Sequence, residues 1–253
     1  MSRSAERAHA ARRTVVEAAL AARTAHIGSS LSIVDVLAVL YSDVLGDDDR
    51  FLLSKGHAAS ALYATLAAHG KLDRDEVIQG YCSDGGAFAG HPERGVAGIE
   101  MTGGSLGHGP AIGVGLALAG CRTYCLVGDG ELNEGSVWEA IMLAGHHGLS
   151  NLTLIVDANG LQGLGTTGEV LDLEPLLPKL TSFGWHVSEV DGHDHDGLRR
   201  VLGYQPSLKP HVVVARTTKG FGVSFMENEL MWHYKSLRPD QHDEVLADLE
   251  ATA

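Results

Sequence analysis

Cysteines, basic residues and long apolar runs are scarce in this 253-residue sequence, and each scarcity argues against a class of protein. The three cysteines, Cys82, Cys121 and Cys125, are too few and too scattered for a disulfide framework or a zinc knuckle. Basic residues number 19 against 32 acidic ones, and a formal charge of −13 disfavours nucleic acid or an anionic membrane as partner. No apolar run approaches the roughly 20 residues of a membrane span. We therefore expect a cytoplasmic protein with reduced thiols.

Glycine, histidine and apolar residues are plentiful instead. The apolar fraction of 44% is sufficient for a sizeable core. The 32 glycines indicate many tight turns and close approaches of the backbone to a ligand. The 14 histidines indicate proton chemistry, metal ligation or anion binding. The first twenty residues, MSRSAERAHAARRTVVEAAL, carry charges throughout and predict an amphipathic helix, not a signal peptide.

Strands and helices alternate in the second half of the chain. Strands are predicted at 122–127, 152–156, 185–190 and 211–215, with helices at 111–119, 135–147, 174–183 and 196–202. Runs such as LTLIV and HVVVA are continuously apolar, which is typical of strands covered on both faces. The pattern predicts an α/β fold with a doubly wound, mostly parallel sheet and helices on both faces.

The first half of the chain carries helical patterns and one long irregular segment. Helices are predicted at 4–23, 31–45 and 56–70, and a short strand at 51–54. Residues 80–109 are glycine-rich and irregular, and a segment of that length is usually functional. No linker or repeat divides the chain, so residues 1–253 are expected to form a single domain.

Polar side chains follow two consecutive predicted strands. Gly128-Asp129-Gly130 ends one strand, and Asn159 follows the next, thirty positions after Asp129. Ligands bind at the carboxyl ends of strands in doubly wound sheets, so these groups should meet there. Carboxylate and amide oxygens suit Mg²⁺ or Ca²⁺, and Mg²⁺ commonly completes its shell with phosphate oxygens. Asp-Gly and Asn-Gly are also ordinary turn pairs, but their combination at this spacing favours a metal site.

This spacing resembles the thiamin-diphosphate signature, and the surrounding motifs are similar to those of the transketolase family. They run in order along nearly the whole chain: AHIGSSLS, LSKGHAASALY, AGHPE, TGGSLGHGPAIGVGLALA, GDGELNEGSVWEA, DANGLQ and TTKGFGVSFMENELMWH. The resemblance covers the diphosphate-binding half of the family and implies a thiamin-diphosphate-binding fold, with the pyrimidine-binding domain absent from this chain. It implies the N-terminal subunit of a split transketolase, which moves a two-carbon ketol unit from a ketose to an aldose. The partner would be a separately encoded pyrimidine-domain subunit, with two copies of each chain.

The resemblance also implies roles for individual residues. The metal, Mg²⁺ or Ca²⁺, would be held by Asp129, Asn159 and the carbonyl of Leu161. Thiamin diphosphate would contact His57, Gly104, Ser105, Leu106, Asp129, Asn159, His233 and the backbone N–H of Gly130. The catalytic residues would be His26, His91 and His233, which line the substrate channel and handle hydroxyl protons. The subunit interface would contain Glu134 and Glu139.

Alternatives remain for the function. A related thiamin enzyme, similar to deoxyxylulose-phosphate synthase or to 2-oxoacid dehydrogenases, would use the same cofactor site. A non-catalytic module that holds the cofactor or a partner is the alternative from another class.

Individual residues also leave alternatives. Glu131 is expected to be a solvated acid at a helix start, and the same interpretation is the alternative to the interface for Glu134 and Glu139. The segment Asp191–Gly197 resembles a metal cluster, but Asp194 or Asp196 more simply caps the following helix. Two positions depart from the family's pattern: Ile27 stands where proline is common, and Phe221 where a second basic residue is common. These departures bear on loop shape and substrate preference.

Overall fold

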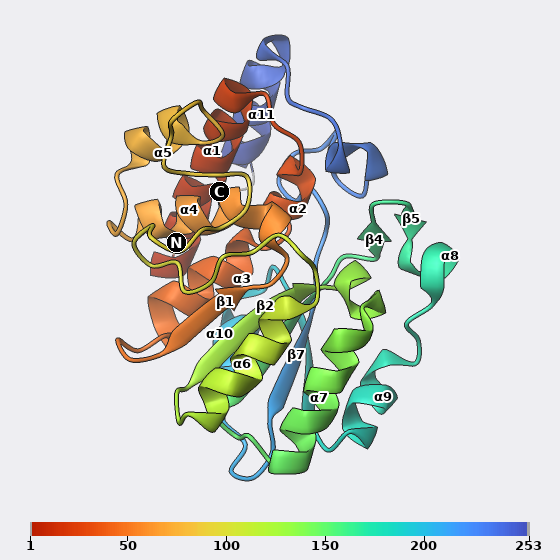
Figure 1. The fold of residues 1–253 in the computed structure, drawn as a ribbon. Helices are drawn as coiled ribbons and strands as arrows, with labels where there is room; N and C mark the ends of the chain where they lie inside the picture. Colours follow the sequence, from red (N-terminus) through yellow and green to blue (C-terminus); the bar gives the residue numbers. More distant parts are fainter. Residues whose placement is uncertain (1, 252–253) are drawn as a thin grey trace.

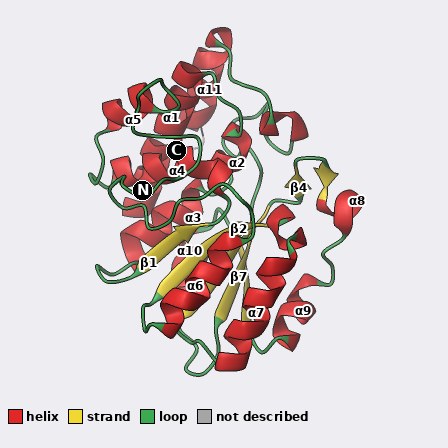
Figure 2. Ribbon diagram, in the orientation of Figure 1, coloured by secondary structure: helices red, strands yellow, loops and turns green. Residues whose placement is uncertain are grey.

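The computed structural model describes residues 2–251 and contains a central parallel sheet. In spatial order its strands are β1 (Arg50–Leu53), β2 (Thr123–Gly128), β3 (Leu152–Ala158), β7 (His211–Arg216) and β6 (His186–Asp191). Every neighbouring pair is parallel, and helices connect successive strands (Figure 2). The predicted fold class, an α/β doubly wound sheet, is confirmed.

Helices cover both faces of the sheet. In chain order they are α1 (Arg3–Ala22), α2 (Ile27–Leu31), α3 (Val34–Val39), α4 (Ala59–Ala68), α5 (Arg74–Gly80), α6 (His108–Leu118), α7 (Gly135–His147), α8 (Thr167–Leu171), α9 (Leu176–Ser182), α10 (His195–Leu202) and α11 (His242–Ala251). A small hairpin of β4 (Leu161–Gln162) and β5 (Gly165–Thr166) follows β3. In Figure 1, α6 and α7 lie side by side over one face of the sheet. The helices α5, α8 and α11 and the hairpin add to the elements that the sequence predicted.

Each strand contributes alternate residues to two separate cores. On β2, Tyr124 and Leu126 pack into the core that contains α1, α3 and α4. Cys125 and Val127 pack into the other core, which contains α6, α7 and α9. Side chains of a strand alternate between the two faces of its sheet, so a strand covered on both faces must be apolar throughout. This explains the continuous apolar runs, because every residue of β2 and β3 is buried.

The apolar segment after His26 is not the single helix predicted at 31–45. It starts earlier, at Ile27, breaks at Ser32 and Ile33, and ends in a π-helical turn at Leu40–Val44. By length and composition Ile27–Val44 could cross a membrane, but 78% of this segment is buried inside the protein. It is therefore a core segment, and its break turns Ser32 toward the site described below.

The irregular segment is confirmed between α5 and α6. Residues 81–107, all of which are described, contain only isolated bridges, between Tyr81 and Phe88 and between Arg94 and Val96. In Figure 1 this segment crosses the same face of the molecule as α4 and leads into the start of α6. The chain thus delivers its glycine loop to the carboxyl edge of the sheet.

Candidate functional site

A cavity of about 310 Å³ opens at the carboxyl ends of β2 and β3, the edge at which doubly wound sheets bind ligands. The predicted site residues that line it are His26, His57, His91, Gly104, Leu106, Asp129, Gly130, Asn159, Leu161 and His233. Ser105 is exposed and does not line this cavity. The fold therefore brings the predicted metal, cofactor and catalytic groups into one place, and their roles remain predictions.

Asp129 and Asn159 meet because β2 pairs with β3, and each residue directly follows its strand. The Asp129 carboxylate is 5% exposed and accepts hydrogen bonds from the N–H groups of Gly130 at 2.8 Å and Gly160 at 2.5 Å. The first bond uses the N–H that was expected to bind a phosphate oxygen. Burial, followed by the neighbouring Asp157, raises the pKa of Asp129 to about 6. A cation would offset this cost of ionisation, so the environment of Asp129 fits a metal ligand.

Asn159 is held with its carbonyl oxygen available. Its amide nitrogen donates to Asp157 at 3.0 Å, while its Oδ1 accepts the N–H of Leu161 at 3.0 Å. An amide oxygen has two lone pairs, so a second acceptor position remains. With Asp129 and the Leu161 carbonyl, the donor set is entirely oxygen, which fits Mg²⁺ or Ca²⁺. Clusters of three or more His, Cys, Asp or Glu residues that could hold a metal are absent from the described residues. A cation here would therefore need oxygens from a ligand or water as well.

Lys55 and Asp157 form a buried ion pair at the wall of the cavity, and sequence reasoning missed both residues. Each is 1% exposed. Asp157 also accepts hydrogen bonds from Ser32 at 2.9 Å and from the hydroxyl of Thr217, while Lys55 donates to the Ser29 carbonyl at 3.0 Å. Burial pushes the pKa of Asp157 up, but Lys55 and the hydrogen bonds hold it below its ordinary value. The sequence signal that could have identified them is a charged residue at the end of a buried strand. Lys55 lies two residues after β1, and Asp157 lies next to the last residue of β3.

Three imidazoles, those of His26, His57 and His233, converge on the cavity. The ring centroids of His26 and His233 lie 4.8 Å apart, and each lies 5.4 Å from that of His57. Burial is the largest cause that lowers the pKa of all three, and it brings that of His233 to about 3. The rings are therefore neutral at neutral pH, and each can donate one hydrogen bond and accept another.

Lys219 places a second buried ammonium at the cavity, and the sequence did not predict it. The residue is 1% exposed, and its Nζ lies 3.2 Å from Nδ1 of His233. Burial and the nearby Lys55 lower the pKa of Lys219 to about 8. Two cationic side chains that face one cavity repel each other, and an anionic ligand would relieve that repulsion. Lys219 could thus offer its charge to an anionic ligand, in a cavity that is also lined by the carboxylates of Asp129 and Glu131.

The prediction that Glu131 is a solvated acid is wrong, because the side chain is 2% exposed. One carboxylate oxygen accepts the N–H of Gly107 at 2.7 Å and the hydroxyl of Ser54, and the other accepts the N–H of Gly128 at 3.2 Å. Gly107 has a φ of +83°, and a Cβ there would lie 2.4 Å from Oγ of Ser136. A single carboxylate therefore ties the glycine loop before α6 to the end of β2. The 3₁₀ turn after Asp129 directs this side chain inward, which local sequence does not reveal.

The segment Asp191–Gly197 is not part of this cavity. Asp194 caps α10, and its carboxylate accepts the N–H of Asp196 at 3.1 Å. The capping interpretation is confirmed, and the described residues contain no metal cluster in this segment.

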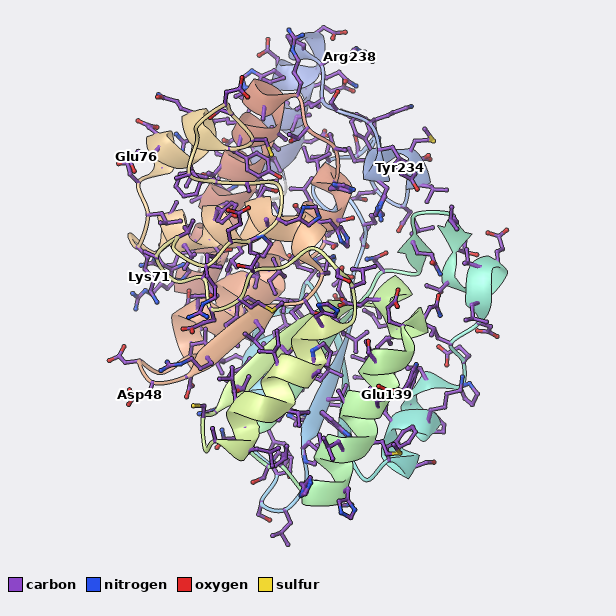
Figure 3. The ribbon with its side chains drawn as sticks, in the orientation of Figure 1. Asp48, Lys71, Glu76, Glu139, Tyr234 and Arg238 are labelled. Carbon is purple, nitrogen blue, oxygen red and sulfur yellow. The ribbon has the colours of Figure 1, made fainter. Side chains whose placement is uncertain are left out.

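The outer sides of α6 and α7 are apolar and uncovered in this chain. Their exposed apolar side chains, with fractional exposure, are Ile112 (41%), Leu118 (53%), Met142 (56%) and Leu143 (43%). Glu134, which directly precedes α7, and Glu139 within α7 are both exposed, and Glu139 lies on the outer side of α7 (Figure 3). Apart from His108, α6 has no ionisable residue, and a helix that is apolar all round is normally covered on every side. We call these exposed apolar residues the α6–α7 face.

Comparisons with known proteins agree with this geometry. A family model described as "Transketolase, thiamine diphosphate binding domain" matches residues 4–122 and 120–249. One of the subunits of apulose-4-phosphate transketolase from Phocaeicola vulgatus is 40% identical, over 94% of this chain and 90% of that protein. The SqwG subunit of 6-deoxy-6-sulfo-D-fructose transketolase from a Clostridium species is 39% identical, over 89% of this chain and 88% of that protein. The solved transketolase of Leishmania mexicana superimposes with a TM-score of 0.90 and 31% identity, over 99% of this chain but 42% of the longer one.

Proposed function

This chain belongs to the transketolase family, as its thiamin-diphosphate-binding domain, and we propose that it is the diphosphate-binding subunit of a split transketolase. The observation that carries the proposal is the cavity at the strand ends, where cation-binding oxygens, two buried lysines and neutral imidazoles converge. Relatives that are named as individual transketolase subunits, and whose length this chain nearly matches, support a second subunit encoded separately. The proposed reaction is transfer of a two-carbon ketol unit from a ketose to an aldose.

The chain's own residues would bind the diphosphate end of the cofactor. Asp129, Asn159 and the Leu161 carbonyl would hold Mg²⁺ (or Ca²⁺), and the metal would neutralise part of the diphosphate charge. Lys219 would contribute a further positive charge, and His57 a neutral hydrogen-bond donor. Thiamin diphosphate, when bound, would supply the electron sink for negative charge that develops at the substrate's carbonyl carbon.

The remaining histidines would act on the sugar. His26, His91 and His233 line the cavity, and a neutral imidazole can take a proton from a hydroxyl while its other nitrogen donates a hydrogen bond. Burial keeps His233 unprotonated at neutral pH, which suits a proton acceptor. Several imidazoles in one cavity also match a substrate with several hydroxyls better than a 2-oxoacid.

The α6–α7 face would be covered by the second subunit. It begins beside the cavity, since Leu106 lines the cavity and Gly107 caps α6, so a partner seated there could also reach the cofactor. Glu134 and Glu139 lie at the start of the same surface and would be part of the interface. We propose an assembly with two copies of each chain.

Reconstitution tests this function. The chain is mixed with a candidate pyrimidine-domain partner, thiamin diphosphate and Mg²⁺, and assayed for ketol transfer with phosphorylated and unphosphorylated sugars, and for turnover of 2-oxoacids. We expect ketol transfer by the mixture and almost none by either chain alone. In the same assay, Asp129→Ala should abolish Mg²⁺-dependent cofactor binding, whereas His91→Ala should lower turnover with the cofactor still bound. Full activity of this chain by itself would contradict the split-enzyme proposal. If the mixture turned over 2-oxoacids but no sugars, the function would instead be that of a 2-oxoacid dehydrogenase-like subunit.

A further inference from the structure

Two residues to which the proposed function assigns no role lie against each other outside the cavity. The ring of His193, from the apparent metal cluster, stacks on Phe221 with centroids 3.5 Å apart and an angle of 11°. Phe221 stands where a basic residue is common in the family. The guanidinium carbon of Arg12 lies over the same Phe221 ring, 5.0 Å from its centroid. A planar stack and a cation over the ring both fix the position of Phe221.

A buried carboxylate fixes the His193 ring. Asp35 of α3 is 2% exposed, and it accepts hydrogen bonds from Nδ1 of His193 at 2.7 Å and from Nε2 of His195 at 2.9 Å. Arg12 of α1 pairs with the same carboxylate. Burial opposes ionisation of Asp35, but Arg12 and the two histidines hold its pKa well below the usual range. Asp35 is therefore an anion at neutral pH, and His193 must present a proton to it from Nδ1.

The other nitrogen of His193 holds the backbone of the loop after β7. The N–H of Thr218 donates to Nε2 of His193 at 2.9 Å. This bond and the bond to Asp35 together require the neutral tautomer with its proton on Nδ1. Thr218 immediately precedes Lys219, and the N–H of Gly220 donates to the Gly28 carbonyl at 2.9 Å. The backbone on both sides of Lys219 is thus fixed to other elements.

We propose that His193 is a positioning residue for the loop Thr217–Phe221. Its imidazole, oriented by Asp35, holds the Thr218 N–H with one edge and the Phe221 ring with its face, and so sets the ammonium of Lys219 in the cavity. His193 does not itself line the cavity. His193 of the Asp191–Gly197 segment therefore serves the cofactor site from a distance, through the loop, whereas His195 contacts Asp35 and Ser4 and not the loop. The part of this inference that concerns the cofactor rests on the proposed function, because it assumes that Lys219 contacts the diphosphate.

Two substitutions separate the two bonds of His193. The amide of His193→Asn can still donate to Asp35, but it is too short to accept the Thr218 N–H. The oxygen of His193→Gln can reach the position of Nε2 and accept that N–H. The matched control is His195→Asn, because His195 bonds to Asp35 and to Ser4 at 2.9 Å but does not touch the loop.

Hydrogen exchange on the full chain, without cofactor, measures the loop directly. We expect His193→Asn to accelerate exchange of the Thr218 amide about tenfold, the effect of losing one hydrogen bond. In the reconstituted complex, the same variant should raise the Kd for thiamin diphosphate about tenfold, while kcat at saturating cofactor stays close to that of the unmodified chain. His193→Gln should restore most of both values. His195→Asn should lower the melting temperature but change neither value.

The outcomes separate this proposal from the proposed function. Unchanged Thr218 exchange in His193→Asn would overturn the loop anchor, as would an equal loss of cofactor affinity in His195→Asn. If Thr218 exchange responds as expected but the unmodified complex binds no thiamin diphosphate, the anchor stands and the proposed function fails. If exchange responds and cofactor affinity does not, Lys219 does not depend on this loop geometry.

Discussion

Glu131 shows at the scale of one residue how this site is organised. Its carboxylate accepts hydrogen bonds from three groups, the N–H groups of Gly107 and Gly128 and the hydroxyl of Ser54. Ser54 in turn accepts the N–H of Gly109 at 3.1 Å. One side chain thereby connects the end of β2, the residue after β1 and the start of α6. A buried acceptor of this kind matters because the groups it satisfies have no water to replace it.

The first prediction concerns Glu131→Gln. The amide offers one acceptor oxygen, and its NH₂ would face a backbone N–H, so at least one buried donor loses its partner. We expect the free energy of unfolding to fall by about 1–3 kcal/mol and cofactor affinity in the reconstituted enzyme to fall with it. Urea unfolding and calorimetric titration measure the two effects. The control is Glu139→Gln, an exposed acid on α7, which should leave chain stability within about 0.5 kcal/mol. Equal stability of both variants would contradict the role assigned to Glu131.

At the scale of elements, α6 and α7 bury one side against the sheet and expose apolar side chains on the other. The core beneath them contains Val114, Ala117, Val137 and Ile141, so their inner faces are buried against the sheet. The outer face of α6 has small residues at Ala111 and Gly115 between its larger apolar side chains, and a Cβ on Gly115 would meet nothing within 4 Å. A helix of another chain could therefore approach α6 closely, since small side chains permit short interhelical distances.

The second prediction follows from this uncovered face. Met142→Glu places a charge on the α6–α7 face, and Met142 is 56% exposed and outside both cores, so the chain should fold normally. We expect assembly with the partner to weaken at least tenfold, since burying an unpaired carboxylate is costly. Co-purification and light scattering measure the assembly. The control is Leu208→Glu, because Leu208 is 80% exposed in the loop before β7 and is not one of the residues of the α6–α7 face. Undiminished assembly of Met142→Glu would place the interface elsewhere.

At the scale of the whole molecule, the described fold buries several ionisable groups, most of them at or beside the cavity. Asp35, Lys55, Asp129, Glu131, Asp157 and Lys219 are all buried. For most of these groups the surroundings favour one protonation state over the other. The free energy of unfolding should therefore depend on pH. His211 at the start of β7 gives the simplest case, because it lies outside the cavity and is 0% exposed.

The third prediction is acid sensitivity through His211. Burial, followed by the neighbouring His186, lowers the pKa of His211 to about 4, whereas an unfolded histidine titrates near 6.5. Between these values the unfolded chain binds more protons than the folded one. The contribution of neutral His211 to the free energy of unfolding is therefore fully present above about pH 6.5 and is lost as the pH falls toward 4. We expect the free energy of unfolding to drop by on the order of 2 kcal/mol between pH 7 and pH 4.5 from this group.

Urea unfolding at a series of pH values tests this contribution. His211→Asn should flatten the pH dependence, although its stability at pH 7 will differ from that of the unmodified chain. His147→Asn is the matched control, because His147 is exposed on α7 and should leave the slope unchanged. An unaltered slope in His211→Asn would assign the acid sensitivity to other groups.

The sequence by itself determined the features that depend on short stretches of chain. Continuous apolar runs marked the strands of a sheet covered on both faces, and a residue directly after each strand has to lie at its carboxyl edge. Asp129 and Asn159 were therefore predictable as neighbours, whereas His57 and His233 were placed with them only by the resemblance to the transketolase family. The helix at 31–45 was mistaken because an apolar segment packed on all sides has no periodicity that marks a break at Ser32 and Ile33.

Only the tertiary structure decided which charges are buried and what they bind. Lys55 meets Asp157 across 102 positions of sequence, and His193 meets Asp35 across 158. Local sequence makes both lysines and Glu131 look like solvated surface residues, because a charged side chain is normally exposed unless a partner is supplied. The partner comes from a different element in each case. The position of Lys219 depends on His193, Asp35 and Phe221 together, and no single motif contains all of these residues.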